Sequence, residues 1–260
     1  MEQPDRPAKR IIRINQGEIV TGVPATASLC SNHILASLPE EEYQALKPAL
    51  DYVPTPMHAV LFERDGDIRY VYFPLSGCHS VLAIMLDGAA VEVGTIGNEG
   101  MSTVDVLTGS TTAVETTVCQ IPGYSLRMPA EKFKQAIEGN SELKRLVYRF
   151  LQAYLSQVSQ SVACNRLHRT EERFARWILL SHDRVQGDEL QLTQEYLADM
   201  LGVHRPSVSL IARRFQKAGL LDYHRGTVKI LDRAGLEKSA CECYSVVRKQ
   251  FARALGKPVG

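Results

Sequence analysis

The pattern of hydrophobic and polar positions divides the chain into three successive parts. Between residues 57 and 128, short runs of β-branched and aromatic residues are separated by turn pairs such as Asp65-Gly66, Asp87-Gly88 and Pro122-Gly123. Many short strands at this spacing predict an antiparallel barrel or roll. The predicted strands are 59–63, 70–75, 80–86, 90–96, 112–121 and 124–128.

The region before the barrel is predicted to be mostly irregular. Residues 1–28 hold no sustained hydrophobic period, so we expect a loosely ordered arm. Asn32 is a good N-cap for a short helix over 34–38. A second helix follows Pro39, because three glutamates in its first turn interact favourably with the helix dipole.

A long amphipathic helix is predicted from Ser141 to about Arg166. Its apolar positions keep helical spacing, at 143, 146, 147, 150, 151, 154, 155, 158 and 162. At about 1.5 Å per residue it would be nearly 40 Å long. A helix of this length between two domains can pair with its own copy, so we expect a dimer. The alternative is that its apolar stripe packs only on its own barrel.

The C-terminal part is predicted to contain three helices and a small hairpin. Thr170 and Thr193 are expected to cap the first two helices, and Gly202-Val203-His204 forms a tight turn before the third, which runs from Arg205-Pro206 to Gly219. The hairpin strands are 220–223 and 227–231, and Asp232 is expected to cap one final helix through about Arg253. Helix, glycine turn and helix with a hairpin indicate a winged helix-turn-helix.

These elements predict an α+β protein with three functional parts and an arm. The boundaries are a flexible N-terminal arm at 1–28, a jelly-roll-like antiparallel β-roll sensor domain at 29–139, a dimerisation helix at 140–168, and a winged helix-turn-helix domain with a C-terminal helix at 169–260.

The charge distribution supports this division. The formal net charge is +1, but residues 164–260 carry 17 Lys and Arg against 11 Asp and Glu, whereas the rest carries 13 against 18. An excess of positive charge in one part indicates a domain that meets a polyanion. Double-stranded DNA is therefore the expected partner of the C-terminal part.

The predicted recognition helix carries residues suited to reading DNA. Arg205 lies at its N-terminus with Ser207 and Ser209, and the planar fork of an arginine matches guanine O6 and N7 together. The N-terminus of a helix attracts phosphate groups, and side chains at this N-terminus can donate hydrogen bonds to phosphate oxygens. The complete set of expected DNA contacts is Thr193, Gln194, His204, Arg205, Ser207, Ser209, Leu210, Arg213, and Arg225 and Lys229 on the wing.

The segment 192–209, read Leu-Thr-Gln-Glu-Tyr-Leu-Ala-Asp-Met-Leu-Gly-Val-His-Arg-Pro-Ser-Val-Ser, followed by Gly219-Leu-Leu, resembles the DNA-binding domain of the Crp/Fnr regulator family. The resemblance implies that Arg205 reads guanine and that Ser207 contacts phosphate. Pro206 stands where many members have a base-contacting Glu, and Leu210 where many have a second Arg. We therefore expect a different operator, in which Leu210 meets a thymine methyl.

The barrel departs further from this family. Members that bind cyclic nucleotides carry a Gly-Glu turn followed by an Arg-Ser or Arg-Thr pair, and here only the turn is matched, by Gly97, Glu99, Gly100 and Met101 as the candidate effector pocket. No Arg or Lys occurs between residues 70 and 126. A buried phosphate without a charge partner is costly. Glu99 is instead expected to accept backbone N–H groups within its turn.

The remaining chemistry predicts no cofactor and no metal. Only Cys30 lies near the N-terminus, where the oxygen-sensing branch of the family holds an iron–sulfur cluster. Cys78-His79 is expected to be packing rather than a haem site. Cys241 and Cys243 have no second pair to complete a zinc site, so a redox role or simple burial remains open. Barrel enzymes need clustered ligands, and His58 and His79 are far apart, so no enzyme is expected.

The sequence thus predicts a cytoplasmic transcription regulator that binds a palindromic operator as a homodimer. Its expected partners are double-stranded DNA, a second copy of the chain and RNA polymerase, and there is no membrane segment. An unidentified small-molecule effector is left open. The alternatives are a cyclic-nucleotide-responsive regulator and a redox- or haem-sensing regulator of the same fold.

Overall fold

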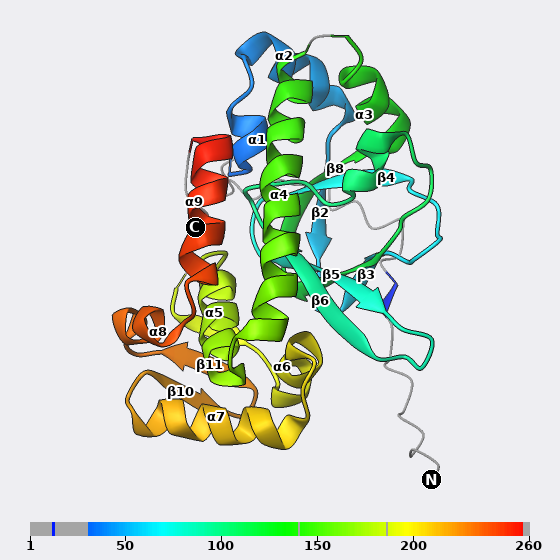
Figure 1. The fold of residues 1–260 in the computed structure, drawn as a ribbon. Helices are drawn as coiled ribbons and strands as arrows, with labels where there is room; N and C mark the ends of the chain where they lie inside the picture. Colours follow the sequence, from blue (N-terminus) through cyan, green and yellow to red (C-terminus); the bar gives the residue numbers. More distant parts are fainter. Residues whose placement is uncertain (1–11, 14–30, 140, 186, 257–260) are drawn as a thin grey trace.

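The computed structural model describes residues 12–13, 31–139, 141–185 and 187–256 (Figure 1). Of the arm expected at 1–28, only the short strand β1 (Ile12–Arg13) is described, and it pairs in parallel with β3. The rest of that arm, with Cys30, lies outside the described residues.

The N-terminal half folds into two β-sheets that face each other. One has the strand order β1-β3-β7-β5-β6 and the other β2-β8-β4, and apart from β1 all pairs are antiparallel. The strands are β2 (Asp51–Thr55), β3 (Ala59–Phe62), β4 (Tyr70–Pro74), β5 (Cys78–Ile84), β6 (Ala90–Ile96), β7 (Thr116–Ile121) and β8 (Gly123–Pro129). The predicted antiparallel roll is confirmed.

Strand β2 was not predicted from the sequence. It contains Pro54, and a proline lacks the N–H group that a central strand needs. The structure places β2 at the edge of its sheet, paired only with β8, so the missing donor costs little. This segment can form a strand despite its proline because it lies at the edge of the sheet, and only the tertiary structure shows that position.

Short helices cover the ends of the roll. They are α1 (His33–Ala36), α2 (Glu40–Leu46), the 3₁₀ helices η1 (Lys47–Ala49) and η2 (Val104–Thr108), and α3 (Ala130–Ala136). The Asn32 side chain accepts the N–H groups of Ile34 and Leu35, which confirms the predicted cap. Asn32 also donates to Gly100 O at 2.7 Å, so the α1 cap is tied to the turn beside the candidate effector pocket.

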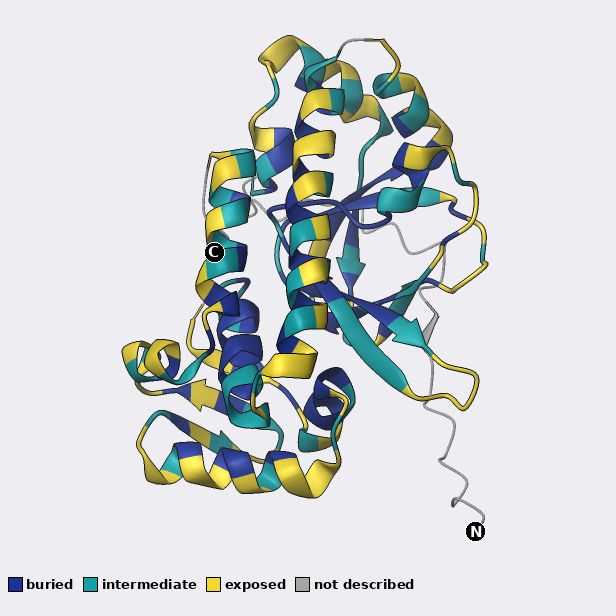
Figure 2. Cartoon of the chain, in the orientation of Figure 1, coloured by how far each residue is buried: buried dark blue, intermediate teal, exposed yellow. Residues whose placement is uncertain are grey.

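The long helix α4 (Glu142–Leu167) has Ser141 as its N-cap and matches the predicted span of 141 to about 166. At about 1.5 Å per residue it is about 39 Å long. Its inner face, which includes Leu143, Val147 and Phe150, is buried in the core of its own chain. Figure 2 shows exposed positions along the opposite face of α4. Only some of the apolar residues of this helix are therefore buried against the roll of the same chain.

The C-terminal part is a winged helix-turn-helix. Its elements are α5 (Thr170–His182), β9 (Glu189–Gln191), α6 (Gln194–Leu201), α7 (Arg205–Lys217), β10 (Leu221–His224), β11 (Thr227–Ile230), α8 (Arg233–Ser239) and α9 (Cys243–Leu255). Gly202 ends α6 with φ 62°, a left-handed conformation that glycine adopts without strain. Strand β9 adds a third member to the predicted wing sheet, in the order β10-β11-β9.

Two details of this part were predicted incorrectly. The N-cap of α5 is Arg169, and Thr170 is its first residue; the Glu172 carboxylate accepts the Arg169 N–H at 2.8 Å. The single final helix is in fact two, because Ala240 is extended with ψ 152°. The break lets α9 turn back and pack along α4, which a straight helix could not do (Figure 1).

The roll, α4 and the C-terminal helices share one hydrophobic core. Buried residues from the strands, from α4 and from α5 to α7 belong to a single cluster, and α6 packs directly on β6. None of the described helices combines the length and the apolar content needed to cross a membrane.

Candidate nucleic-acid interface and the sealed barrel turn

Helix α7 lies at the bottom of the molecule in Figure 1, and most of its polar residues are exposed. Its opposite face is buried through Val208, Ile211, Ala212 and Phe215, as predicted. The candidate DNA contacts at 193, 204, 205, 207, 210, 213, 225 and 229 are exposed, and those at 194 and 209 are half-buried. The structure thus gathers the predicted residues on one accessible surface.

The two helices of the motif are held together by polar contacts as well as packing. The Thr193 hydroxyl accepts the Tyr196 N–H at 3.1 Å, which caps α6. The Ser209 hydroxyl donates to the Gln194 side chain, so α7 is fastened to the start of α6. This contact occupies two of the predicted DNA-contacting side chains in the free protein and fixes the angle between the two helices.

The arginines of α7 differ in their availability. Arg214 pairs with Glu171 on α5, whereas Arg205 and Arg213 form no ion pair with any described residue. Pro206 and Leu210 lie between them and line a shallow groove with them. Two unpaired cations along an exposed helix face leave a strong positive field directed at solvent.

The wing is less free than α7. Lys229 lies 3.8 Å from Glu189 on the neighbouring strand, with both side chains more than half exposed. Arg225 has φ 47° at the tip of the hairpin, next to Gly226. An exposed pair of this kind contributes little energy, so Lys229 can exchange Glu189 for another anion.

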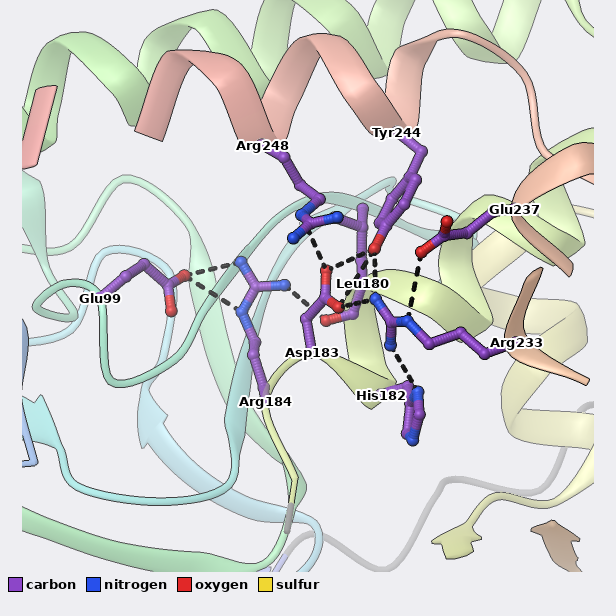
Figure 3. Close-up of polar contacts among 9 residues, drawn as sticks. All are labelled: Glu99, Leu180, His182, Asp183, Arg184, Arg233, Glu237, Tyr244 and Arg248. Carbon is purple, nitrogen blue, oxygen red and sulfur yellow. Dashed lines mark hydrogen bonds and ion pairs between the residues drawn. The ribbon is translucent and has the colours of Figure 1, made fainter. Parts of the chain in front are cut away.

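The candidate effector turn is closed by the chain itself. The Glu99 carboxylate accepts the Gly97 N–H at 3.0 Å, the backbone contact expected from the sequence. Its main partner is a cation from another domain, Arg184, which follows α5. Arg184 Nη2 and Nε donate to the same Glu99 oxygen at 2.6 and 3.1 Å, and both side chains are fully buried (Figure 3).

Arg184 is held rigidly in this position. Its Nη1 donates to Leu180 O at 2.7 Å, so the guanidinium bridges the end of α5 and the barrel turn. Burial alone would lower the pKa of Arg184, but the Glu99 carboxylate raises it above the usual value. The guanidinium therefore keeps its charge, and its contact with Glu99 joins the winged domain to the roll.

The space around this turn is filled by side chains of α4. A Cβ added to Gly100 would overlap the Phe150 ring at 2.0 Å, and one added to Gly94 would meet the Tyr154 ring at 2.8 Å. Met101 is also completely buried. The four predicted pocket residues thus lie together, but Arg184 and Phe150 occupy the volume beside Gly97 and Gly100.

A second polar network joins the two domains through Glu92 on β6. Trp177 on α5 donates to Glu92 Oε1 at 2.9 Å, and Ser80 lies 2.6 Å from Glu92 Oε2. Burial raises the pKa of Glu92 to about 7, against the effect of these hydrogen bonds. Ser80 also faces the acceptor oxygen of Gln120; because Ser80 has one proton, a protonated Glu92 that donates to Ser80 satisfies all three groups.

The end of α5 is also fastened to the last two helices. Arg233 on α8 donates to the Asp183 carboxylate at 2.5 Å, and the Tyr244 hydroxyl on α9 donates to it at 3.0 Å (Figure 3). Arg248 lies 4.0 Å from the same carboxylate. Asp183 and Arg184 therefore point to opposite sides, one toward α8 and α9 and the other into the roll.

The cysteine and histidine candidates have two different outcomes. His79 is buried, its Nδ1 is 2.7 Å from the Ser102 hydroxyl, and burial lowers its pKa to about 3. Cys78 is also buried, and burial raises the pKa of its thiol. Cys241 and Cys243, which have no second pair near them in the sequence, are joined in the structure by Cys164 and His168.

Several residues of this site carry no recognisable sequence signal. Arg184 lies 85 positions from Glu99, between Asp183 and Val185 in a mostly polar segment after α5. Glu92 offered a weak signal, as a carboxylate within a strand that is otherwise apolar or small. Both become informative only when the winged domain is seated on the roll.

Comparison with known proteins agrees with this geometry. The profile of the Crp-like helix-turn-helix domain matches residues 172–239, which run from α5 to α8. The comparison with curated protein sequences gives no match.

Solved structures extend the likeness to most of the chain. FixK2 from Bradyrhizobium japonicum superposes with a TM-score of 0.63 at 13% identity, over 74% of this chain and 98% of that one. A transcriptional regulator of the CRP family from Thermus thermophilus gives 0.59 at 17%, over 80% and 98%. The c-di-GMP-responsive global regulator CLP of Xanthomonas campestris gives 0.56 at 17%, over 74% and 99%.

These likenesses, at 13% to 17% identity, show a common fold over 74% to 80% of this chain. Residues 172–239 are therefore a Crp-like helix-turn-helix domain, and the chain has the architecture of Crp/Fnr-family transcription regulators.

Proposed function

We propose that this protein is a sequence-specific DNA-binding transcription regulator that acts on RNA polymerase at promoters. The observation that carries the proposal is the pair of unpaired arginines, Arg205 and Arg213, on the exposed face of α7 in a Crp-like helix-turn-helix domain. Arg205 lies in the first turn, where the recognition helix meets base edges. Arg225 and Lys229 would contact the phosphate backbone from the wing.

A homodimer is the second part of the proposal. The exposed face of α4 carries an outer stripe of Tyr148, Leu151, Leu155, Val158 and Val162, spaced alternately by three and four residues. Leu155 and Val162 are 55% and 68% exposed. This spacing is that of a coiled-coil seam, which a second copy of the helix covers. Two-fold symmetry would set the recognition helices about 34 Å apart on a palindromic operator.

The third part is that cyclic AMP or cyclic GMP does not gate binding. Glu99 stands in the turn that resembles the nucleotide-binding turn of the family, and its carboxylate is already paired with Arg184. A nucleotide would have to expel a buried cation and the Phe150 ring beside Gly100. An effector of a different chemistry remains compatible with this arrangement.

Selection of bound sequences from random duplexes, followed by footprinting, tests the first two parts together. We expect a palindrome with half-sites one helical turn apart, and a dimer by light scattering at micromolar concentration. Val162→Glu should give monomers and select a single half-site, whereas Gln152→Glu, which adds the same charge beside the stripe, should not. A non-symmetric site bound by a monomeric wild-type protein would overturn the dimer.

A further inference from the structure

Four side chains with metal-binding atoms meet where the long helix ends. Cys164 and His168 come from the last turn and the C-cap of α4. Cys241 lies in the turn after α8, and Cys243 is the first residue of α9. Their Sγ and ring nitrogen atoms all lie within 4.8 Å of one another. The three cysteines are buried and form a small cluster separate from the main core.

Two of the distances between these atoms are close to those in a tetrahedral coordination shell. Cys164 Sγ is 3.5 Å from Cys241 Sγ, and Cys243 Sγ is 3.4 Å from His168 Nδ1. Zinc bonds of about 2.3 Å to sulfur and about 2.0 Å to nitrogen place ligand atoms about 3.8 and 3.5 Å apart in a tetrahedron. These two distances match within a few tenths of an ångström, and the other pairs lie within 4.8 Å.

The groups around the cluster orient its ligands. His168 Nε2 lies 3.2 Å from the Glu242 carboxylate, so the ring is turned with Nδ1 toward the sulfurs. A carboxylate behind a ligating histidine is the usual outer partner at zinc sites, where it fixes the ring orientation. Gln160 donates an N–H to Cys243 Sγ at 3.0 Å, a contact that stabilises a thiolate.

The surroundings also supply positive charge. Three thiolates and a neutral imidazole around a divalent ion carry one net negative charge. Arg176 is buried near Cys164, and its Nη2 donates to the Ser161 hydroxyl at 3.1 Å. Arg176 also interacts electrostatically with Cys164. Arg173 on the same helix, half-buried, interacts with Cys164 and Cys241 as well.

We propose that Cys164, His168, Cys241 and Cys243 bind one zinc ion in a closed, four-coordinate site. With four protein ligands no position is left for water or substrate, so the ion is structural. A surface cleft lined by Cys241, Glu242 and Tyr244 reaches the cluster and provides its entry path.

The position of the site gives it a mechanical role. His168 is the C-cap of α4, and α5 begins at Thr170, so the ion lies at the joint between the long helix and the winged domain. It would tie this joint to the turn from which α9 runs back along α4. Zinc therefore holds the recognition helix at a defined angle to the long helix.

Metal analysis of the full-length protein, purified under reducing conditions without added metal, tests the proposal. We expect one zinc per chain by plasma mass spectrometry, lost in Cys243→Ser and in His168→Gln. Matched controls are Cys119→Ser, a buried cysteine outside the cluster, and His224→Gln, an exposed histidine on the wing; both should keep the ion. Zinc contents equal in all five proteins, or no zinc in wild type, would overturn the site.

A second measurement does not depend on the folding of variants. Wild-type protein stripped of metal by a mercurial reagent and a chelator, then regenerated with thiol and loaded with Co²⁺, should show the intense d–d bands of tetrahedral coordination and thiolate charge-transfer bands. Removal of the metal should lower the melting temperature, and addition of zinc should restore it. Octahedral Co²⁺ bands, or an intact mass two hydrogens short from a Cys164–Cys241 disulfide without metal, would overturn the proposal.

Discussion

Arg184 and Arg205 are both arginines of the winged domain, and their environments are opposite. Arg184 is enclosed between α5 and the barrel turn, where its ionic partner is Glu99. Arg205 is exposed at the start of α7 and has no ionic partner among the described residues. Arg184 serves the protein's own architecture, whereas Arg205 is left for an anion from outside.

This difference shows why a resemblance in one region does not transfer to the other. In the helix-turn-helix, the fold leaves the predicted residues accessible, so the chemistry read from the sequence remains available. In the barrel, the turn that resembles a nucleotide-binding turn is present, but the carboxylate of Glu99 is paired with Arg184 from a distant segment of the chain. Accessibility, and not residue type, separates the two regions.

The largest expected effect comes from breaking the buried pair. Arg184→Met should lower the free energy of unfolding by about 3–5 kcal/mol, because the Glu99 charge is left buried without its partner. Urea denaturation followed by circular dichroism measures it. The double variant Glu99→Gln with Arg184→Met should recover part of the loss.

The matched control is Arg166→Met, an exposed arginine at the end of α4, which should change stability by no more than about 0.5 kcal/mol. If Arg184→Met changed the free energy of unfolding as little as this control does, the Arg184–Glu99 pair would not stabilise the fold. The contrast between the closed Glu99 turn and the exposed face of α7 would then be wrong.

The next effect concerns the open face. Arg205→Ala should weaken the selected operator by about 1–3 kcal/mol and relax the preference at one base pair per half-site. Lys229→Ala should instead weaken all duplexes alike and reduce the salt slope by about one unit. Fluorescence anisotropy on cognate and scrambled duplexes separates the two. Intact sequence preference in Arg205→Ala would show that another residue reads the guanine.

A pH-dependent effect is expected at the interface between the two regions. Because the folded pKa of Glu92 is about 7 and its ordinary value is about 4.5, the folded state holds a proton that the unfolded state releases between these pH values. Its contribution to stability is complete below pH 4.5 and is lost as pH rises through about 7. The slope is at most about 1.4 kcal/mol per pH unit.

The measurement is the difference between wild type and Glu92→Gln across this range. Buried His79, whose pKa is lowered to about 3, acts in the opposite sense below its ordinary value of about 6.5. Both proteins contain His79, so its effect cancels in the difference. A difference that is flat with pH would mean that Glu92 stays ionised in the folded state.

The smallest expected effect is that of cyclic nucleotides. Saturating cyclic AMP or cyclic GMP should change operator affinity less than threefold, because the Glu99 turn is occupied by Arg184. Calorimetry on the protein alone checks binding directly. A micromolar Kd coupled to tighter operator binding would show that Arg184 swings out and that the sealed turn can open.

Local pattern was enough to predict the elements near which the function lies. Asn32 and Thr193 cap the helices expected of them, and α7 buries the predicted face. Strand alternation and turn pairs indicated the roll. These signals succeed because caps, periodicity and glycine turns depend on residues a few positions apart.

The sequence by itself determined the order of roll, long helix and helix-turn-helix, and the residues that α7 exposes. Only the tertiary structure decided that Arg184 closes the Glu99 turn, and that Cys164 and His168 join Cys241 and Cys243 across about 77 positions of chain. The break at Ala240 was also decided by the tertiary structure, because it allows α9 to fold back on α4. Such contacts depend on how whole helices and sheets pack against one another, and the local pattern of residues does not reveal that packing.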